Sequence, residues 1–281
     1  MKNYLILLQA AILSIIWVIP STLKAQHDKP HEVVYKQIDT VSLKMQVFYP
    51  DNFDPSKKYP AIIFFFGGGW NNGSTGQFAP HAAYFASKGM VAFTADYRVK
   101  SRQQTTPWES VKDARSSIRF LRKNAAAFSI DTNRIVAAGG SAGGHIAAAA
   151  DLTAIDEPTD NFNYGARPDA LVLFNPVINN GPGGFGYERF GEKYAGISPY
   201  HNIKKGAAPA IIFLGTKDQL IPVQQVKDYQ ERMKEAGSRC EVYLYEGQQH
   251  GFFNYKKEGS SYYDATLKEA TVFLRSLGYI P

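Results

Sequence analysis

Residues 135–147 decide the fold, and they read Ile-Val-Ala-Ala-Gly-Gly-Ser-Ala-Gly-Gly-His-Ile-Ala. The apolar start has the length of a buried strand, and the alanine-rich end is typical of a helix. Ser141 lies at the bend between them, where a strained backbone requires small neighbours. Gly139 and Gly143 meet that requirement at the spacing of the Gly-x-Ser-x-Gly motif. A glycine-rich loop with a helix-capping serine is the alternative, but the flanking strand and helix favour a nucleophilic Ser141.

The overall composition is that of an ordinary globular protein. The chain has 281 residues, of which 44% are hydrophobic and 20% are charged, and this length suffices for one large α/β domain with a buried core. The formal net charge is +6, but the lysine and arginine residues do not cluster as a nucleic-acid groove requires. We therefore expect no nucleic-acid partner. The sequence predicts no particular oligomeric state.

The N-terminus is typical of a secretory signal peptide. Lys2 supplies the positive charge, residues 5–18 are mostly apolar, and Ala25 offers a cleavage point. The apolar run is shorter than the roughly 20 residues that cross a bilayer, so we expect cleavage rather than a membrane anchor. No cysteine lies directly after the run, which argues against a lipoprotein leader. The prediction is a leader at 1–25 and a secreted or periplasmic domain at 26–281, without stable membrane insertion.

Apolar runs of strand length alternate with helical patterns along the rest of the chain. Residues 26–35 are interpreted as a loose lead-in, and 43–49 as an edge strand. The other expected strands are 61–66, 90–95, 135–140, 171–174, 210–214 and 240–245, and the expected helices are 80–88, 108–124, a segment starting at Ala142, 223–236 and 264–277. This alternation predicts a single α/β domain, with a mostly parallel sheet and helices on both faces.

Residues 175–208 have no clear periodicity and contain several aromatic side chains. A long irregular insertion in a compact domain is often a lid over a site. The alternative is that its aromatic residues pack on one another and hold the insertion down. The candidate substrate contacts are Trp70, Phe185, Tyr187 and Phe252.

Residues that carry chemistry follow the ends of separate predicted strands. Ser141, Asp218 and His250 each come shortly after such an end. The parallel strands of an open sheet bring these ends to one edge. A serine hydroxyl is a weak nucleophile and needs a base, which His250 would provide, while Asp218 would orient the imidazole. This chemistry needs no metal ion and no cofactor, and we expect none.

A glycine triplet at 67–69 follows another buried strand. Glycines at such a position let the backbone turn with its N–H groups exposed, and an oxyanion needs such donors. The candidate donors are Gly68 or Gly69, together with Ala142 directly after the serine. An ordinary glycine turn is the alternative for the triplet taken alone.

Three other residues compete for catalytic roles. His145 lies inside the predicted helix that starts at Ala142, where a structural role is expected. Glu246 is too close to His250 in the sequence to reach across to it. Cys240 opens a strand with no neighbour that would activate its thiol.

Further motifs occur in order over most of the chain: Phe-Gly-Gly-Gly-Trp at 66–70, Asp-Tyr-Arg at 96–98, Asp-Thr-Asn-Arg-Ile at 131–135, Gly-Gly-Ser-Ala-Gly-Gly-His at 139–145, Ser-Pro at 198–199, Gly-Thr-Lys-Asp-Gln-Leu-Ile-Pro at 215–222 and His-Gly-Phe at 250–252. Together they resemble the α/β-hydrolase superfamily, and more closely its bacterial acetyl-esterase/lipase and carbohydrate-esterase group. The resemblance implies the triad roles for Ser141, Asp218 and His250. It also implies the oxyanion roles for Gly68, Gly69 and Ala142.

One residue departs from the family pattern. The family usually has His-Gly-Gly before the oxyanion donors, and Phe66 replaces that histidine here. The family histidine mainly braces the loop, so the change bears on the geometry of the donors more than on the reaction.

The resemblance and the predicted leader together lead us to expect an exported serine esterase that hydrolyses short-chain carboxylic esters, with acetyl or feruloyl groups on polysaccharide as the expected substrates. A prolyl-oligopeptidase-like peptidase is an alternative, although such enzymes usually carry a large additional domain. A non-catalytic hydrolase-like binding protein is another, although the triad is complete. A formamidase also fits the motifs, but the export signal argues against that cytosolic chemistry.

Overall fold

The computed structural model describes residues 31–281, so the predicted leader at 1–25 lies outside the described residues. Its centre is an eight-stranded sheet in the order β1-β2-β4-β3-β5-β6-β7-β8. The strands are β1 (His31–Ile38), β2 (Val41–Phe48), β3 (Tyr59–Phe65), β4 (Val91–Ala95), β5 (Ile130–Gly140), β6 (Ala170–Phe174), β7 (Ala210–Gly215) and β8 (Cys240–Tyr245).

The sheet is mostly parallel, as predicted. The strands from β4 to β8 pair in parallel, whereas β1 pairs with β2 and β2 with β4 in antiparallel fashion. Parallel neighbours require crossover connections, and helices supply them. Because helices cover both faces, the central strands are buried and read as continuous apolar runs.

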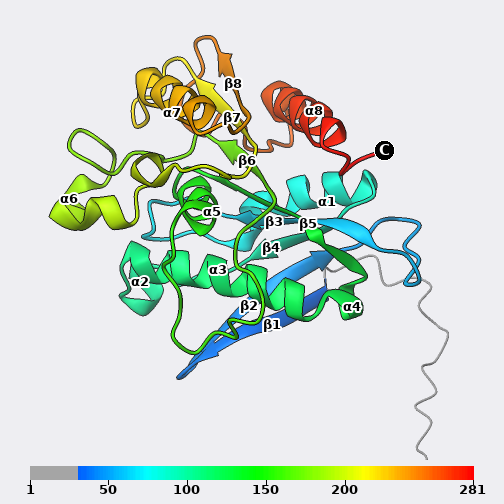
Figure 1. Cartoon of the computed structure of the whole chain (residues 1–281). Coiled ribbons are helices and arrows are strands. Elements are labelled where there is room, and N and C mark those ends of the chain that lie inside the picture. The colour runs from blue at the N-terminus through cyan, green and yellow to red at the C-terminus, as the bar shows by residue number, and fades with distance from the viewer. Residues whose placement is uncertain (1–30) are drawn as a thin grey trace, which may run out of the picture. The chain divides into compact units, whose positions relative to one another are not determined.

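Figure 1 shows α1 and α8 together on one side of the sheet, and α3, α5 and α7 on the other. The α-helices are α1 (Ala79–Ser87), α2 (Lys100–Gln103), α3 (Pro107–Lys123), α4 (Ala125–Phe128), α5 (Ala142–Leu152), α6 (Tyr187–Phe190), α7 (Val223–Glu235) and α8 (Ser261–Ser276). Three 3₁₀ turns complete the described chain: η1 (Thr75–Phe78), η2 (Gly191–Gly196) and η3 (Pro199–Asn202). The insertion at 175–208 therefore consists of loops and the short turns α6, η2 and η3.

The N-terminal edge of the sheet differs from the prediction. Strand β1 occupies the edge, whereas the segment expected there forms β2, the second strand. Two features hide β1 in the sequence: a bulge between Val34 and Lys36, and the burial of a lysine on this strand. The Lys36 ammonium lies 2.7 Å from the carboxylate of Asp113 and 3.1 Å from that of Glu157. Because buried charges need partners, this strand becomes recognisable only when its distant partners are known.

The turn after β5 brings three backbone segments into close contact. A Cβ atom at Gly139 would lie 2.5 Å from the backbone of Gly143, and one at Gly143 would lie 2.0 Å from the carbonyl oxygen of Phe65 at the end of β3. Both distances are far shorter than any van der Waals contact, so only glycine fits. Ser141 takes the bend itself, with φ 54° and ψ −119°.

Gly143→Ala is expected to lower the free energy of unfolding by on the order of 2 kcal/mol or more, because the added methyl group must displace the end of β3. Chemical denaturation monitored by circular dichroism measures this loss. Gly76→Ala serves as the control, since its Cβ would meet only the Ser74 hydroxyl at 3.7 Å. Equal stability of the two variants would contradict the packing argument.

Candidate active site

Ser141 is held by backbone hydrogen bonds on both sides of the turn. Its N–H donates to the carbonyl of Phe174 at 3.0 Å, which ties it to β6. Its carbonyl accepts from the N–H of His145 at 3.0 Å and from that of Val177 at 3.1 Å. These bonds stabilise the positive φ of a non-glycine residue, which costs of order 1–3 kcal/mol. The side chain is partly exposed at the cavity floor.

Asp218 and His250 follow β7 and β8, and their side chains are hydrogen-bonded. The carboxylate Oδ2 of Asp218 lies 2.7 Å from Nδ1 of His250. Its Oδ1 accepts from the N–H groups of Leu220 and Ile221 at 2.9 and 3.0 Å. The Asp218 side chain is completely buried, whereas 24% of the His250 side chain is exposed. An ionised carboxylate only accepts hydrogen bonds, so the imidazole proton is on Nδ1 and Nε2 carries the lone pair.

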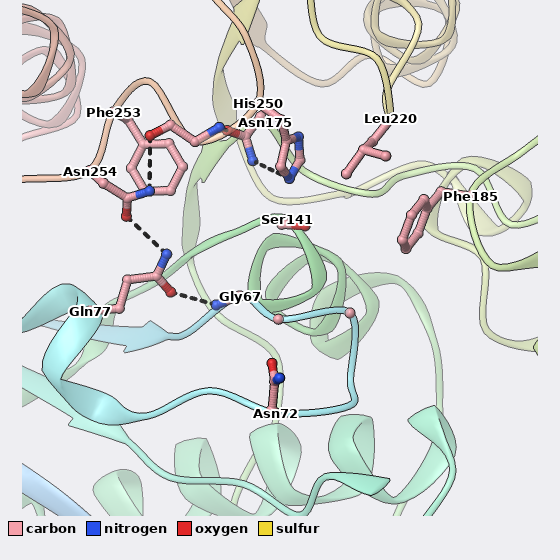
Figure 2. Close-up of a pocket in the computed structure, with 13 residues that line it drawn as sticks. Gly67, Asn72, Gln77, Ser141, Asn175, Phe185, Leu220, His250, Phe253 and Asn254 are labelled. Atoms are coloured by element: carbon pink, nitrogen blue, oxygen red, sulfur yellow. Dashed lines mark hydrogen bonds between the residues drawn. The ribbon is translucent and has the colours of Figure 1, made fainter. Parts of the chain in front are cut away.

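Ser141 and His250 line one cavity of about 320 Å³. Within residues 31–281 no hydrogen bond joins the Ser141 hydroxyl to His250. The Nε2 atom of His250 instead lies 3.4 Å from the side-chain amide nitrogen of Asn175 (Figure 2). Catalytic hydrogen bonds are often long or misaligned without a substrate, so this geometry is compatible with a serine–histidine pair. Sequence reasoning did not identify Asn175, because its proximity to His250 depends on the packing of β6 beside β7.

The candidate oxyanion donors lie at the same cavity. Gly68 and Gly69 line it and have φ values of 121° and 61°, a region that favours glycine. A Cβ at Gly68 would lie 2.2 Å from the carbonyl oxygen of Asn72. Ala142 is the first residue of α5, where helix N–H groups have no intrahelical partner. In the described part of the chain, no protein acceptor takes the N–H of Gly68, Gly69 or Ala142.

Phe66, which replaces the family histidine, stacks on Tyr97 and so braces the glycine loop at 67–69. Its ring lies 4.1 Å from that of Tyr97, with an interplanar angle of 16°. The Tyr97 hydroxyl donates to the Phe66 carbonyl at 2.7 Å, and burial raises the pKa of Tyr97 so that the hydroxyl remains a donor. The guanidinium of Arg102 lies over the Phe66 ring at 5.9 Å. Aromatic packing thus holds this position in place of a polar ring.

A chain of side-chain amides joins the glycine loop to the loop that carries His250. Gly67 donates its N–H to Oε1 of Gln77 at 2.7 Å, and Nε2 of Gln77 donates to Oδ1 of Asn254 at 2.9 Å. The Asn254 amide donates in turn to the carbonyl of Gly251 at 2.9 Å (Figure 2). These hydrogen bonds therefore fix the relative positions of two loops that are far apart in the sequence.

Of the four candidate substrate contacts, one lines the cavity and three lie elsewhere. Phe185 lines the cavity, together with Leu220 and Phe253. Three others do not form its wall. Trp70 is buried against His145, Phe185 and Phe190, Tyr187 donates a hydrogen bond to Glu192, and Phe252 packs on Tyr245 and Tyr262. The sequence could not distinguish Phe252 from Phe253, because which of two adjacent aromatic residues faces the cavity depends on the turn after His250.

The insertion contacts the glycine loop through Arg189 on α6. The Arg189 guanidinium donates to the carbonyl of Gly69 and lies over the ring of Trp70 at 5.8 Å. The loop that carries the candidate oxyanion donors is therefore held from the insertion as well as from the sheet.

None of the three competing residues, His145, Glu246 and Cys240, lines the cavity. His145 is buried between Trp70 and Phe190, and burial lowers its pKa to about 3. Glu246 is exposed and makes no hydrogen bond to His250 within the described residues. Burial raises the pKa of the Cys240 thiol to about 12, so it is protonated and unreactive at neutral pH.

Two absences among residues 31–281 bear on other kinds of site. No group of three or more His, Cys, Asp or Glu side chains is arranged to hold a metal ion in this part of the chain. None of its helices is both long enough and apolar enough to cross a membrane.

Comparison with known proteins agrees with this geometry. A family model described as BD-FAE matches residues 45–179, and the dienelactone hydrolase family model matches residues 186–274. Among solved structures, esterase 2 of Thermogutta terrifontis with bound propionate is 40% identical, covers 91% of this chain and 97% of its own, and superimposes with a TM-score of 0.86. The same esterase is known with butyrate bound and phosphorylated by paraoxon.

The chain belongs to the α/β-hydrolase superfamily, in its group of bacterial esterases. Esterase LipC of Mycobacterium tuberculosis is 30% identical over 70% of this chain and 54% of its own length. Acetylxylan esterase of Xylanibacter ruminicola is 28% identical over 85% of this chain and 49% of its own. The chain thus spans about half the length of the curated relatives it matches.

Burial of His145 makes stability depend on pH. Its pKa of about 3 in the folded protein lies below the ordinary 6.5. The contribution of the neutral His145 to the free energy of unfolding is therefore fully present above pH 6.5 and is lost as the pH falls. Between pH 6.5 and pH 5 the loss amounts to about 2 kcal/mol. His145→Gln removes this titratable group, so denaturation at the two pH values should show a smaller loss of stability at pH 5 than in the parent. His31→Gln, at an exposed histidine, should leave the difference unchanged. An unchanged acid loss in His145→Gln would contradict the assignment.

Proposed function

We propose that this protein is an exported serine esterase that hydrolyses short-chain carboxylic esters through an acyl-enzyme. The observation that carries the proposal is the 2.7 Å hydrogen bond from His250 to Asp218, at the cavity that Ser141 also lines. The family membership supports ester hydrolysis as the reaction class.

In the proposed mechanism, the Ser141 hydroxyl attacks the acyl carbon and its proton passes to Nε2 of His250. Asp218 stabilises the imidazolium through Nδ1. The negative charge on the carbonyl oxygen would be bound by the N–H groups of Ala142 and of Gly68 or Gly69. His250 then protonates the leaving alcohol, and a water molecule, activated by the same imidazole, hydrolyses the acyl-enzyme.

The cavity favours small, uncharged acyl groups. Its apolar wall consists of Phe185, Leu220 and Phe253, and among the described residues that line it His250 alone has a titratable imidazole or charge. A volume of about 320 Å³ is near the lower limit of small-molecule sites. The propionate and butyrate complexes of the Thermogutta esterase support the same size range.

We further propose that the acyl group is acetyl, carried on polysaccharide, and that a cleaved leader at 1–25 exports the domain at 26–281 to the periplasm or the medium. The likeness to acetylxylan esterase and the signal-like N-terminus support this reading. Fold alone does not define a substrate, so this step depends on those two supports. A feruloyl group, the other substrate expected from the sequence, is larger than the acyl groups that this cavity favours.

Ser141→Ala should lower kcat by roughly 10⁴-fold or more, because no other group supplies the attacking oxygen. Hydrolysis of p-nitrophenyl acetate measures this loss. Paraoxon should add one diethyl phosphoryl group to the parent protein and none to the variant, as mass spectrometry would detect. The exposed Ser101→Ala is the matched control and should behave as the parent. Turnover retained in Ser141→Ala would end the assignment.

A series of p-nitrophenyl esters tests the acyl size. kcat/KM should be highest from acetyl to butyryl and should fall by about tenfold or more for decanoyl, because the longer chain exceeds the cavity. Release of acetate from acetylated xylan, compared with a deacetylated sample, tests the polysaccharide. Preference for decanoyl esters would reject the short-acyl proposal.

A further inference from the structure

Asn175 follows β6 and is completely buried beside the candidate base. Its φ of 33° is positive, which is uncommon for a non-glycine residue and persists only where the surroundings stabilise it. Its N–H donates to the carbonyl of Phe213 at 2.7 Å, which anchors it to β7. A strained, buried amide at this position indicates a function beyond ending the strand.

The orientation of the Asn175 amide follows from its partners. The backbone N–H of Gly251 donates to Oδ1 of Asn175 at 2.9 Å. An N–H group requires an acceptor, so the oxygen must be on this side of the amide and the NH₂ group on the other. The NH₂ group therefore faces Nε2 of His250, at 3.4 Å (Figure 2).

Each nitrogen of the His250 imidazole then has a partner of the complementary kind. Asp218 holds the proton on Nδ1 of His250, so Nε2 is an acceptor and Asn175 donates to it. Ser141 would need the same Nε2 lone pair in order to lose its proton. The amide and the hydroxyl thus compete for one site, and the amide occupies it in this structure.

We propose that Asn175 is a positioning residue that holds the His250 imidazole in a resting orientation until an ester is bound. This inference rests on the proposed esterase function. A 3.4 Å contact is long for a hydrogen bond, so the serine hydroxyl displaces it at small cost once substrate orders the site. Among residues 31–281, Asp218 is the charged group that is hydrogen-bonded to the ring, and the other residues that line the cavity are uncharged.

The transfer of the Ser141 proton requires this displacement of the amide, because a protonated Nε2 is a donor and would otherwise face the Asn175 NH₂ group, which is also a donor. The bond from Gly251 meanwhile keeps the loop that carries His250 in place.

Asn175→Asp separates this role from packing, because it keeps the size and the acceptor for Gly251 but replaces the donor with a carboxylate. A carboxylate at this distance accepts from protonated Nε2. The acidic limb of the pH profile of kcat/KM should therefore move to higher pH by about one unit or more. Asn72→Asp places the same charge across the cavity from His250 (Figure 2), and its shift should be smaller.

Asn175→Ala is the second variant and removes both hydrogen bonds. kcat should fall by about tenfold with KM changed less than twofold, because the base is misplaced while the acyl pocket is intact. Paraoxon titration normalises each rate to intact sites, so loss of folded protein does not mimic the effect. A purely structural role predicts lower thermal stability with an unchanged pH profile and normalised kcat. That result in both variants would overturn the proposal.

The ring signals of His250, followed by NMR against pH, provide a readout without turnover. Asn175→Asp should shift the titration midpoint upward, and an unchanged midpoint would contradict the proposal. Failure of the esterase function would be seen separately, as absent hydrolysis and absent paraoxon labelling in the parent protein.

Discussion

The site depends on one close contact: the backbone at the start of α5 lies directly against the ends of β3 and β5. Only hydrogen atoms fit at Gly139 and Gly143, where a methyl group would overlap the backbone. This contact forces Ser141 into a conformation that costs of order 1–3 kcal/mol, and the bonds to Phe174 and Val177 offset that strain. Without the contact, the hydroxyl would not project beside the free N–H groups of the helix and the glycine loop.

The parallel strands account for how residues far apart in the sequence meet. The carboxyl ends of β3, β5, β6, β7 and β8 lie along one edge, and each contributes a short loop with one polar function. Amide side chains then connect these loops to one another, from Gln77 through Asn254 to the backbone of Gly251. Neutral amides suit this purpose because they donate and accept without adding charge near His250.

Sequence reasoning predicted the sheet and most helices because buried strands are apolar runs and amphipathic helices have a clear period. It also singled out Ser141, Asp218 and His250, which lie beside strand ends in recognisable motifs. It missed β1 because Lys36 is buried against carboxylates far away in the sequence. Asn175 was missed for a similar reason: nothing local distinguishes an asparagine that faces an imidazole from one that ends a strand. Partners that only tertiary packing supplies leave no periodic signal.

The Arg189 contact has an evolutionary consequence. The side chain reaches from the insertion, whose Phe185 forms part of the cavity wall, to the carbonyl of Gly69 in the glycine loop. A change in the insertion that admits a new acyl group would also disturb the loop that aligns the N–H donors. In the proposed mechanism, selectivity and turnover are therefore coupled, and lineages that acquire new substrates should alter both segments together.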